Sequence, residues 1–191
     1  MKIKKGDAGY IRKRLKNVVI KTCLEFGIAL ALLGLGIWQT GDRLNLLTVV
    51  AILGCLPASK ALVEWIMIAP HRSIEKERED EIKSIAPHLT CLYDMVFTSE
   101  KKIMPVESIV IFDNTVCGYT SSAKVDTNGT AEHLKKYLSA NKCNKVSVKI
   151  FDNYAAYLKR MQEMNDNAIA KDDDIITKEA LIRQVILSLS L

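Results

Sequence analysis

Two long apolar segments separated by a short polar turn constrain this chain more than any other feature. The first covers residues 18–38 and the second covers residues 46–69, and Gly41 lies in the turn between them. Each segment has roughly the 20 residues that an α-helix needs to cross a hydrocarbon core about 30 Å thick. We therefore predict a transmembrane helical hairpin over residues 18–70.

A cleaved signal peptide is the alternative interpretation of the first apolar segment, because a basic stretch precedes it. However, no small-residue cleavage motif follows Trp38, and the second apolar segment begins almost at once. We therefore favour a membrane helix for both segments.

The positive charge of the chain is concentrated ahead of the first apolar segment. The N-terminal arm, residues 1–17, has seven basic residues against Asp7, whereas residues 71–191 have 17 basic and 18 acidic residues. Basic flanks stay preferentially on the cytoplasmic side and attract anionic lipid. We expect both termini to be cytoplasmic in a cell membrane, and nucleic acid is not an expected partner. The basic residues expected to contact lipid head groups are Lys2, Lys4, Lys5, Arg12, Lys13, Arg14 and Lys16.

Four charged residues lie inside the predicted spans. Lys21 and Glu25 share a face of the first helix, and Lys60 and Glu64 share a face of the second. At about 1.5 Å per residue in an antiparallel hairpin, Lys21 reaches the depth of Glu64, and Glu25 reaches that of Lys60. We predict an ionic cluster made of these two cross-helix pairs, because charges in hydrocarbon tend to pair. Two alternatives stay open: the lysines snorkel to the head groups, or the charges form an ion or proton path.

The rest of the chain has the composition of a soluble domain. We expect a helical linker at residues 71–87 and an α+β domain at residues 88–191. Residues 104–112 and 115–122 predict a hairpin of two strands, because Asp113 and Asn114 form a turn pair between them. The periodicity of the whole region predicts the order helix, three strands, helix, strand, helix, helix.

Residues with reactive or metal-binding side chains are scattered along this region. His88 and Cys91 have the spacing of two metal ligands, which is too few for a site. Cys117 with His133 as its base is a candidate nucleophile, but a cysteine on an apolar strand is more often a core residue. We predict no metal, no cofactor and no disulfide, because the five cysteines lack paired spacing.

The predicted order of elements resembles the core of PD-(D/E)XK nucleases, and in particular NERD-type domains, over roughly residues 73–151. Glu107 in "PVESIVIF" stands near the first acidic position of that family, and Lys124 in "SSAK" stands near its lysine. The resemblance implies a divalent metal that positions water. Ser122 occupies the place of the second acidic residue, which implies an inactive relative. The whole chain also resembles two-span membrane proteins of Gram-positive bacteria, a resemblance that implies no activity.

The sequence thus predicts a two-span membrane protein whose cytoplasmic α+β domain serves binding or assembly and not catalysis. Its expected partners are the lipid bilayer and either another protein or a second copy of the chain. A membrane-tethered, metal-dependent nuclease-like enzyme using Glu107 and Lys124 is the first alternative. A small transporter subunit is the second.

Overall fold

The computed structural model describes residues 3–41, 46–99, 102–143, 145–168 and 172–190. They divide into two compact units. The described parts of residues 1–10 and 73–191 form one unit, and residues 11–72 form the other. The arm expected at residues 1–17 is therefore divided, because its first part joins the C-terminal domain and the remainder begins a long helix. Lys2 lies outside the described residues.

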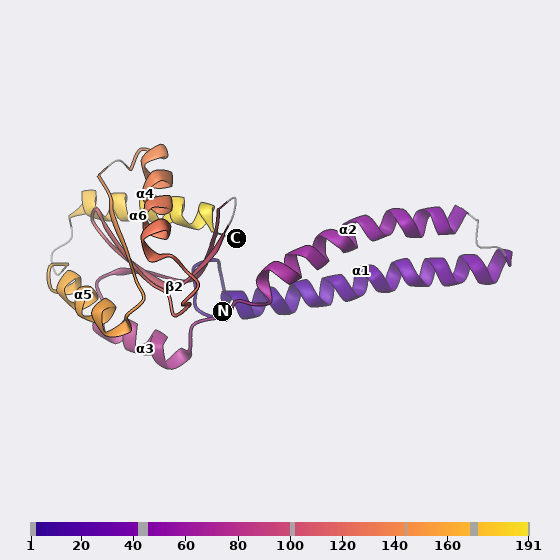
Figure 1. Ribbon diagram of the computed structural model, residues 1–191, viewed down its shortest axis with the longest axis horizontal. Helices are drawn as coiled ribbons and strands as arrows, with labels where there is room; N and C mark the ends of the chain where they lie inside the picture. The colour runs from indigo at the N-terminus through magenta and orange to yellow at the C-terminus, as the bar shows by residue number, and fades with distance from the viewer. Residues whose placement is uncertain (1–2, 42–45, 100–101, 144, 169–171, 191) are drawn as a thin grey trace. The chain divides into compact units, whose positions relative to one another are not determined.

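The smaller unit consists of two antiparallel helices, α1 (Tyr10–Thr40) and α2 (Leu46–Ile68) (Figure 1). Both are long and apolar enough to cross a membrane. The helices approach each other through small side chains, since a Cβ atom placed on Gly54 would lie 4.0 Å from the Cβ of Ala29. Small residues at such positions let the backbones of membrane helices pack closely.

The larger unit is built on a four-stranded sheet in the order β1-β2-β3-β4. Neighbouring strands are antiparallel from β1 to β3, and β4 is parallel to β3. The strands are β1 (Thr90–Thr98), β2 (Ile103–Phe112), β3 (Thr115–Tyr119) and β4 (Ser147–Phe151), and the helices are α3 (Lys76–Ile85), α4 (Thr127–Ala140), α5 (Tyr154–Asp166) and α6 (Asp173–Leu189). The predicted α+β class and the predicted order of elements are confirmed.

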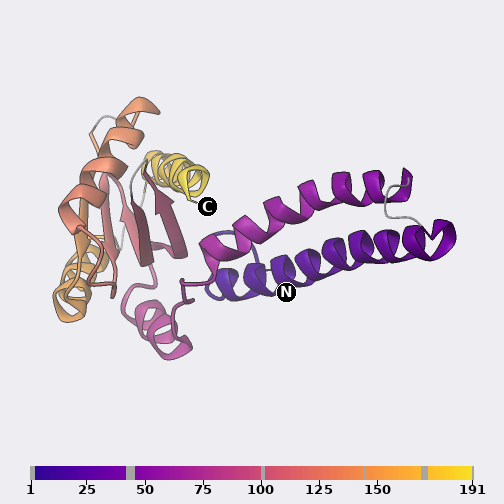
Figure 2. The ribbon, with the colours of Figure 1, turned by 45° about the vertical axis from the view of Figure 1, so that its right-hand side comes forward.

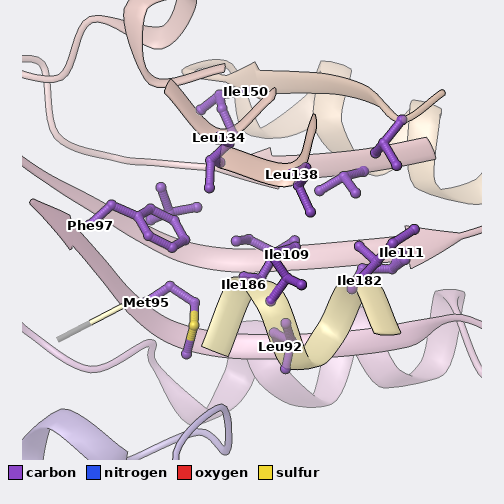
Figure 3. Close-up of a cluster of buried hydrophobic side chains, with 14 of the residues drawn as sticks. Leu92, Met95, Phe97, Ile109, Ile111, Leu134, Leu138, Ile150, Ile182 and Ile186 are labelled. Carbon is purple, nitrogen blue, oxygen red and sulfur yellow. The ribbon is translucent and has the colours of Figure 1, made fainter. Parts of the chain in front are cut away.

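Helices cover both faces of the sheet, with α4 and α6 on one face and α3 and α5 on the other (Figures 1 and 2). On the first face, Leu134 of α4 and Ile182 of α6 are buried in one cluster with Ile109 of β2 (Figure 3). On the second face, Ile82 of α3 and Tyr157 of α5 are fully buried in a separate cluster. Because α3 contributes to this core, it is part of the domain, whereas the sequence suggested a linker.

The segment ahead of α1 packs on the edge strand β1. The backbone N–H of Tyr93 donates to the carbonyl of Gly6 at 2.8 Å, and Lys5 Nζ donates to the carbonyl of Ser190. Gly6 has φ +97°, and a Cβ there would lie 2.9 Å from Leu92 Cδ2. Only glycine suits this backbone conformation and this close approach.

The segment that follows α2 meets the same strand. The backbone N–H of Ile74 donates to Asp94 Oδ1 at 2.9 Å, and both residues are buried. Gly6 and Ile74 lie on either side of the hairpin in the sequence, yet they bind consecutive residues of β1, Tyr93 and Asp94. We call these two hydrogen bonds the β1 clamp.

Candidate functional site

The regular alternation of side chains fails in the middle of β1 and β2. Val106 belongs to the core under α4 and α6, whereas Ser108, two residues later, shares a hydrogen bond of 2.8 Å with the hydroxyl of Tyr157 on α5. Residues two apart in a regular strand would face the same side. The register places Asp94, with φ 55°, across from Glu107 at this break. The pairs on both sides of this point follow the same register, so neither strand contains an extra residue. The left-handed backbone of Asp94 instead marks the place where the side chains change faces.

Glu107 is held by residues from two other parts of the domain, helix α3 and the loop after β3. Its Oε2 accepts a hydrogen bond of 3.3 Å from Arg78 Nη1, and its Oε1 accepts one from Ser121 Oγ. The Arg78 guanidinium also lies 5.3 Å from the ring centroid of Tyr154, whose hydroxyl donates to Glu81 Oε2 at 2.7 Å. We call Arg78, Glu81, Glu107, Ser121 and Tyr154 the Glu107 cluster.

Tyrosine rings lie beneath this cluster. The ring of Tyr119 lies 5.0 Å from that of Tyr154 and 5.7 Å from that of Tyr157. Burial and the hydrogen bond to Glu81 raise the pKa of Tyr154, and burial raises the pKa of Tyr157. Both hydroxyls therefore remain protonated near neutral pH and do not act as bases.

The structure does not bring Lys124 to Glu107. Strand β3 ends at Tyr119, so Lys124 lies in the loop beyond it and not on the strand, as the sequence suggested. No contact joins Glu107 to Lys124 in the described part of the chain. Beyond the end of the strand, the backbone N–H of Ser122 donates to Thr120 Oγ1 at 3.3 Å. Ser121 therefore faces Glu107 in place of the expected lysine.

Glu107 offers hydrogen bonding and charge, but it is not a ready-made metal ligand. Both of its oxygens already accept hydrogen bonds, and the cation of Arg78 occupies the space beside one of them. A divalent ion at this position would be repelled by the guanidinium. Within the described ranges, no group of three or more His, Cys, Asp or Glu residues is placed to hold a metal ion.

The other candidate pairs are also separated. Cys117 lies in the core beneath α3 and α5, where burial raises the pKa of its thiol, whereas His133 lies on α4, which covers the opposite face of the sheet. His133 and Lys124 instead line a cavity of about 280 Å³. His88 uses its backbone N–H to reach Asn165 Oδ1 at 3.1 Å.

The charges in the hairpin pair differently from the sequence hypothesis. Arg14 Nε and Nη2 donate to Glu64 Oε1 at 3.0 and 2.8 Å, and Lys21 Nζ lies 3.7 Å from Glu25 Oε1 in the same helix. The predicted pairs of Lys21 with Glu64 and of Glu25 with Lys60 do not form. The side chain of Lys60 is exposed.

The change of partner has a simple geometric cause. Arg14 precedes Lys21 by seven residues, which is about two turns, so the two side chains occupy the same face of α1. The spacing of charges along one helix predicts which face they share, but it does not predict which residue of the other helix they meet. The planar guanidinium suits a carboxylate better than the ammonium of a lysine does.

The basic residues of the N-terminal arm have two different settings. Lys4 and Lys5 belong to the domain unit, and Lys4 donates its backbone N–H to Asp7 Oδ2 at 2.7 Å. Arg12, Lys13 and Lys16 follow the start of α1 and belong to its first turns. Their contact with lipid stays a prediction.

Sequence reasoning missed Arg78, Asp94 and Ser121. One signal was present, since Asp94 is the only charged residue in the apolar strand "TCLYDMVFT". A buried carboxylate at such a position must be bound by a donor, and the amide of Ile74 provides one.

Comparison with known protein families, with curated proteins and with solved structures finds no match for this chain. Its function is therefore inferred from its own residues.

Proposed function

We propose that this chain is an integral membrane protein that crosses the bilayer twice, and that its α+β domain serves binding or assembly in the cytoplasm. One observation carries the proposal: the segments before and after the hairpin belong to a single compact unit. The hairpin is in effect an insertion into the domain, so the domain is covalently tied to the membrane at two points.

The β1 clamp supports the two-span topology. Because Tyr93 binds Gly6 and Asp94 binds Ile74, both ends of the hairpin meet one folded unit. A folded unit stays on one side of a bilayer, so the chain between the two ends must cross an even number of times. Two helices long enough to span meet this requirement.

The distribution of charge supports a cytoplasmic location. Residues 1–17 contain seven basic residues, and His71, Arg72 and Lys76 follow the second helix. Basic residues near the ends of short spans favour the cytoplasmic side. The exposed lysines and arginines of α1 would then contact anionic head groups. A protein partner or a second copy of the chain completes the proposed set of partners.

The Glu107 cluster supports binding over hydrolysis. Its carboxylate is neutralised by Arg78 and hydrogen-bonded by Ser121, so it holds α3 against the sheet. The NERD-type resemblance is then one of element order, since Ser122 stands in the place of the second acidic residue and Lys124 does not contact Glu107.

Reporter fusions in a bacterial host test the topology. A fluorescent protein that matures only in the cytoplasm and a phosphatase that works only outside it are fused, one at a time, after Ser190 and into the connection between α1 and α2 at residues 41–45. We expect fluorescence from the C-terminal fusion and phosphatase activity from the turn fusion. Phosphatase activity from the C-terminal fusion would overturn the proposed orientation.

A second assay addresses the enzymatic alternative. The full chain in detergent is incubated with Mg²⁺ or Mn²⁺ and with DNA or RNA, beside a Glu107→Gln variant. We expect no difference between the two proteins. Cleavage that is lost in Glu107→Gln would establish the nuclease-like function instead.

A further inference from the structure

A cavity of about 320 Å³ opens at the end of the sheet opposite the loop that carries Lys124. It lies where the β2–β3 turn and the start of β4 meet the end of α4 and the side of α6. Its polar lining comes from Asn114, Lys142, Lys145 and Lys178. A volume of this size falls within the range of small-molecule sites, which is about 300–1,000 Å³.

The lining is cationic. Lys142 and Lys145 have no carboxylate partner within the described ranges, and Lys178 lies 3.8 Å from Asp113 Oδ1. Asp113 is itself occupied on its other oxygen, where Asn114 Nδ2 donates at 3.1 Å. The stretch from residue 131 to residue 149 has five lysines and one glutamate, so the surroundings of the cavity add to its positive field.

The inner surface of the same cavity is apolar. Cys143, Val146 and Ile182 are buried, whereas the side chain of Leu181 is 46% exposed. Burial raises the pKa of the Cys143 thiol, so the sulfur remains uncharged near neutral pH. An exposed leucine beside buried apolar residues gives a ligand an apolar surface to cover.

The walls of the cavity are fixed before any ligand arrives. The carboxylate of Glu179, which is only 3% exposed, accepts from the N–H of Asp113 at 3.3 Å and from Thr90 Oγ1 at 2.7 Å. The carbonyl of Asn114 accepts from the N–H of Ser147 at 2.7 Å. A preformed site loses less conformational entropy on binding.

We propose that this cavity binds a small organic anion, namely a phosphate or carboxylate group joined to an apolar part. The anionic group lies against Lys142 and Lys145, and the apolar part covers Leu181 and Val146. Three ammonium groups exclude a metal cation, and the apolar floor distinguishes the site from one for inorganic phosphate. The inference rests on the binding role proposed above, but it does not depend on the orientation of the hairpin.

Titration of the full chain in a neutral detergent with phenyl phosphate tests the proposal. Phenyl phosphate should bind at least about tenfold more tightly than inorganic phosphate and than neutral phenyl glucoside, since each of those lacks one of the two interactions. Equal affinity for phenyl phosphate and inorganic phosphate would overturn the proposed apolar contact. If none of the three compounds binds, the proposal that this cavity is an anion-binding site is wrong.

Two double lysine variants test whether phenyl phosphate binds in this cavity. Lys142→Gln/Lys145→Gln should weaken the binding of phenyl phosphate by about tenfold or more. Lys102→Gln/Lys159→Gln removes the same charge from residues that neither line the cavity nor lie in the lysine-rich stretch beside it, and it should leave binding unchanged. Both variants should retain the thermal transition of the parent protein, because all four lysines are exposed. Equal affinity in the two double variants would contradict the proposal.

Cys143 provides an independent readout. Alkylation of each cysteine by N-ethylmaleimide is followed by mass spectrometry of the separate peptides. Saturating phenyl phosphate should slow the alkylation of Cys143 several-fold and leave that of Cys91 unchanged, since Cys143 lines the cavity and Cys91 does not. Unchanged alkylation of Cys143 at saturation would overturn the site.

The natural anion could be a lipid or a soluble molecule, and lipid discs distinguish the two. Protection of Cys143 in discs of phosphatidylglycerol, but not of phosphatidylcholine, would identify a lipid head group with its acyl chain. Protection only after phenyl phosphate is added would identify a soluble anion. If binding fails here while the reporter fusions give the expected topology, this site alone is wrong and the membrane assignment stands.

Discussion

The backbone N–H of Tyr93 donates to the carbonyl of Gly6 across 2.8 Å, although the whole α1–α2 hairpin separates the two residues in the sequence. The next residue of the strand, Asp94, binds the N–H of Ile74 on the other side of the hairpin. The two segments that lead into α1 and out of α2 therefore both bind the edge strand of the domain. Changes at either segment should affect the stability of the domain itself.

Gly6→Ala should destabilise the domain more than Gly9→Ala does. Both glycines have positive φ, +97° and +81°, but a Cβ on Gly9 would meet nothing within 4 Å. Gly9→Ala should therefore cost only the backbone strain, about 1–2 kcal/mol. Gly6→Ala should cost about 1 kcal/mol more, because it displaces the fully buried Leu92. Thermal unfolding of the full chain measures the difference, and equal losses would show that the segment does not pack on β1.

Asp94→Ala should be much more harmful than Asp94→Asn. Asparagine keeps an oxygen that can accept from Ile74 and tolerates the φ of 55° at this position. Alanine leaves the buried N–H of Ile74 unpaired, which should cost about 1–3 kcal/mol. Chemical denaturation of both variants compares them. A neutral effect of Asp94→Ala would contradict the second half of the β1 clamp.

The hairpin should depend on Arg14 more than on Lys21. Arg14→Gln leaves Glu64 without its cation, whereas Lys21→Gln leaves the Arg14–Glu64 pair intact. Because Glu64 lies near the end of the predicted span, we expect a loss of about 1–2 kcal/mol for Arg14→Gln, less than for an unpaired charge at the centre of a bilayer. The double variant Arg14→Gln/Glu64→Gln should recover most of it. Unfolding in a denaturing detergent measures these effects, and a larger loss for Lys21→Gln would favour the register predicted from the sequence.

Stability should fall at alkaline pH because of the buried Tyr157. Burial raises its pKa above the value of about 10 that tyrosine has in an unfolded chain. The unfolded chain therefore releases this proton first, so the contribution is complete below about pH 10 and is lost as the pH rises further. Between pH 8 and pH 11 the parent protein should lose more stability than Tyr157→Phe does. Tyr137→Phe, on α4, serves as a control that should follow the parent.

The apolar runs and the turn residues predicted the hairpin and the order of the elements, because both depend on local periodicity. The Glu107 cluster could not be predicted in the same way. The break in alternation between Asp94 and Glu107 changes which side chains share a face, and periodicity assumes that no such break exists. As a result Ser121 faces Glu107, and Lys124 lies beyond the strand.

The β1 clamp could not be predicted from the sequence either, but for a different reason. Lys4 and Lys5 read as part of a basic arm, and nothing local shows that Gly6 and Tyr93 pair across so long a separation. The glycines at positions 6 and 9 were the one available sign of a special backbone. The register of Arg14 with Glu64 likewise depends on how two helices pack, which charge spacing along one helix does not determine.

Hydrogen exchange at the backbone N–H of Tyr93 tests the central claim most directly. It is measured in the full chain and in a variant that begins at Gly9, both in the same detergent. If the segment ahead of α1 is part of the domain, this N–H is protected in the full chain and exchanges at least about tenfold faster in the variant. The N–H of Val110, in the central strand, serves as the internal reference. Equal protection of Tyr93 in the two proteins would contradict the account.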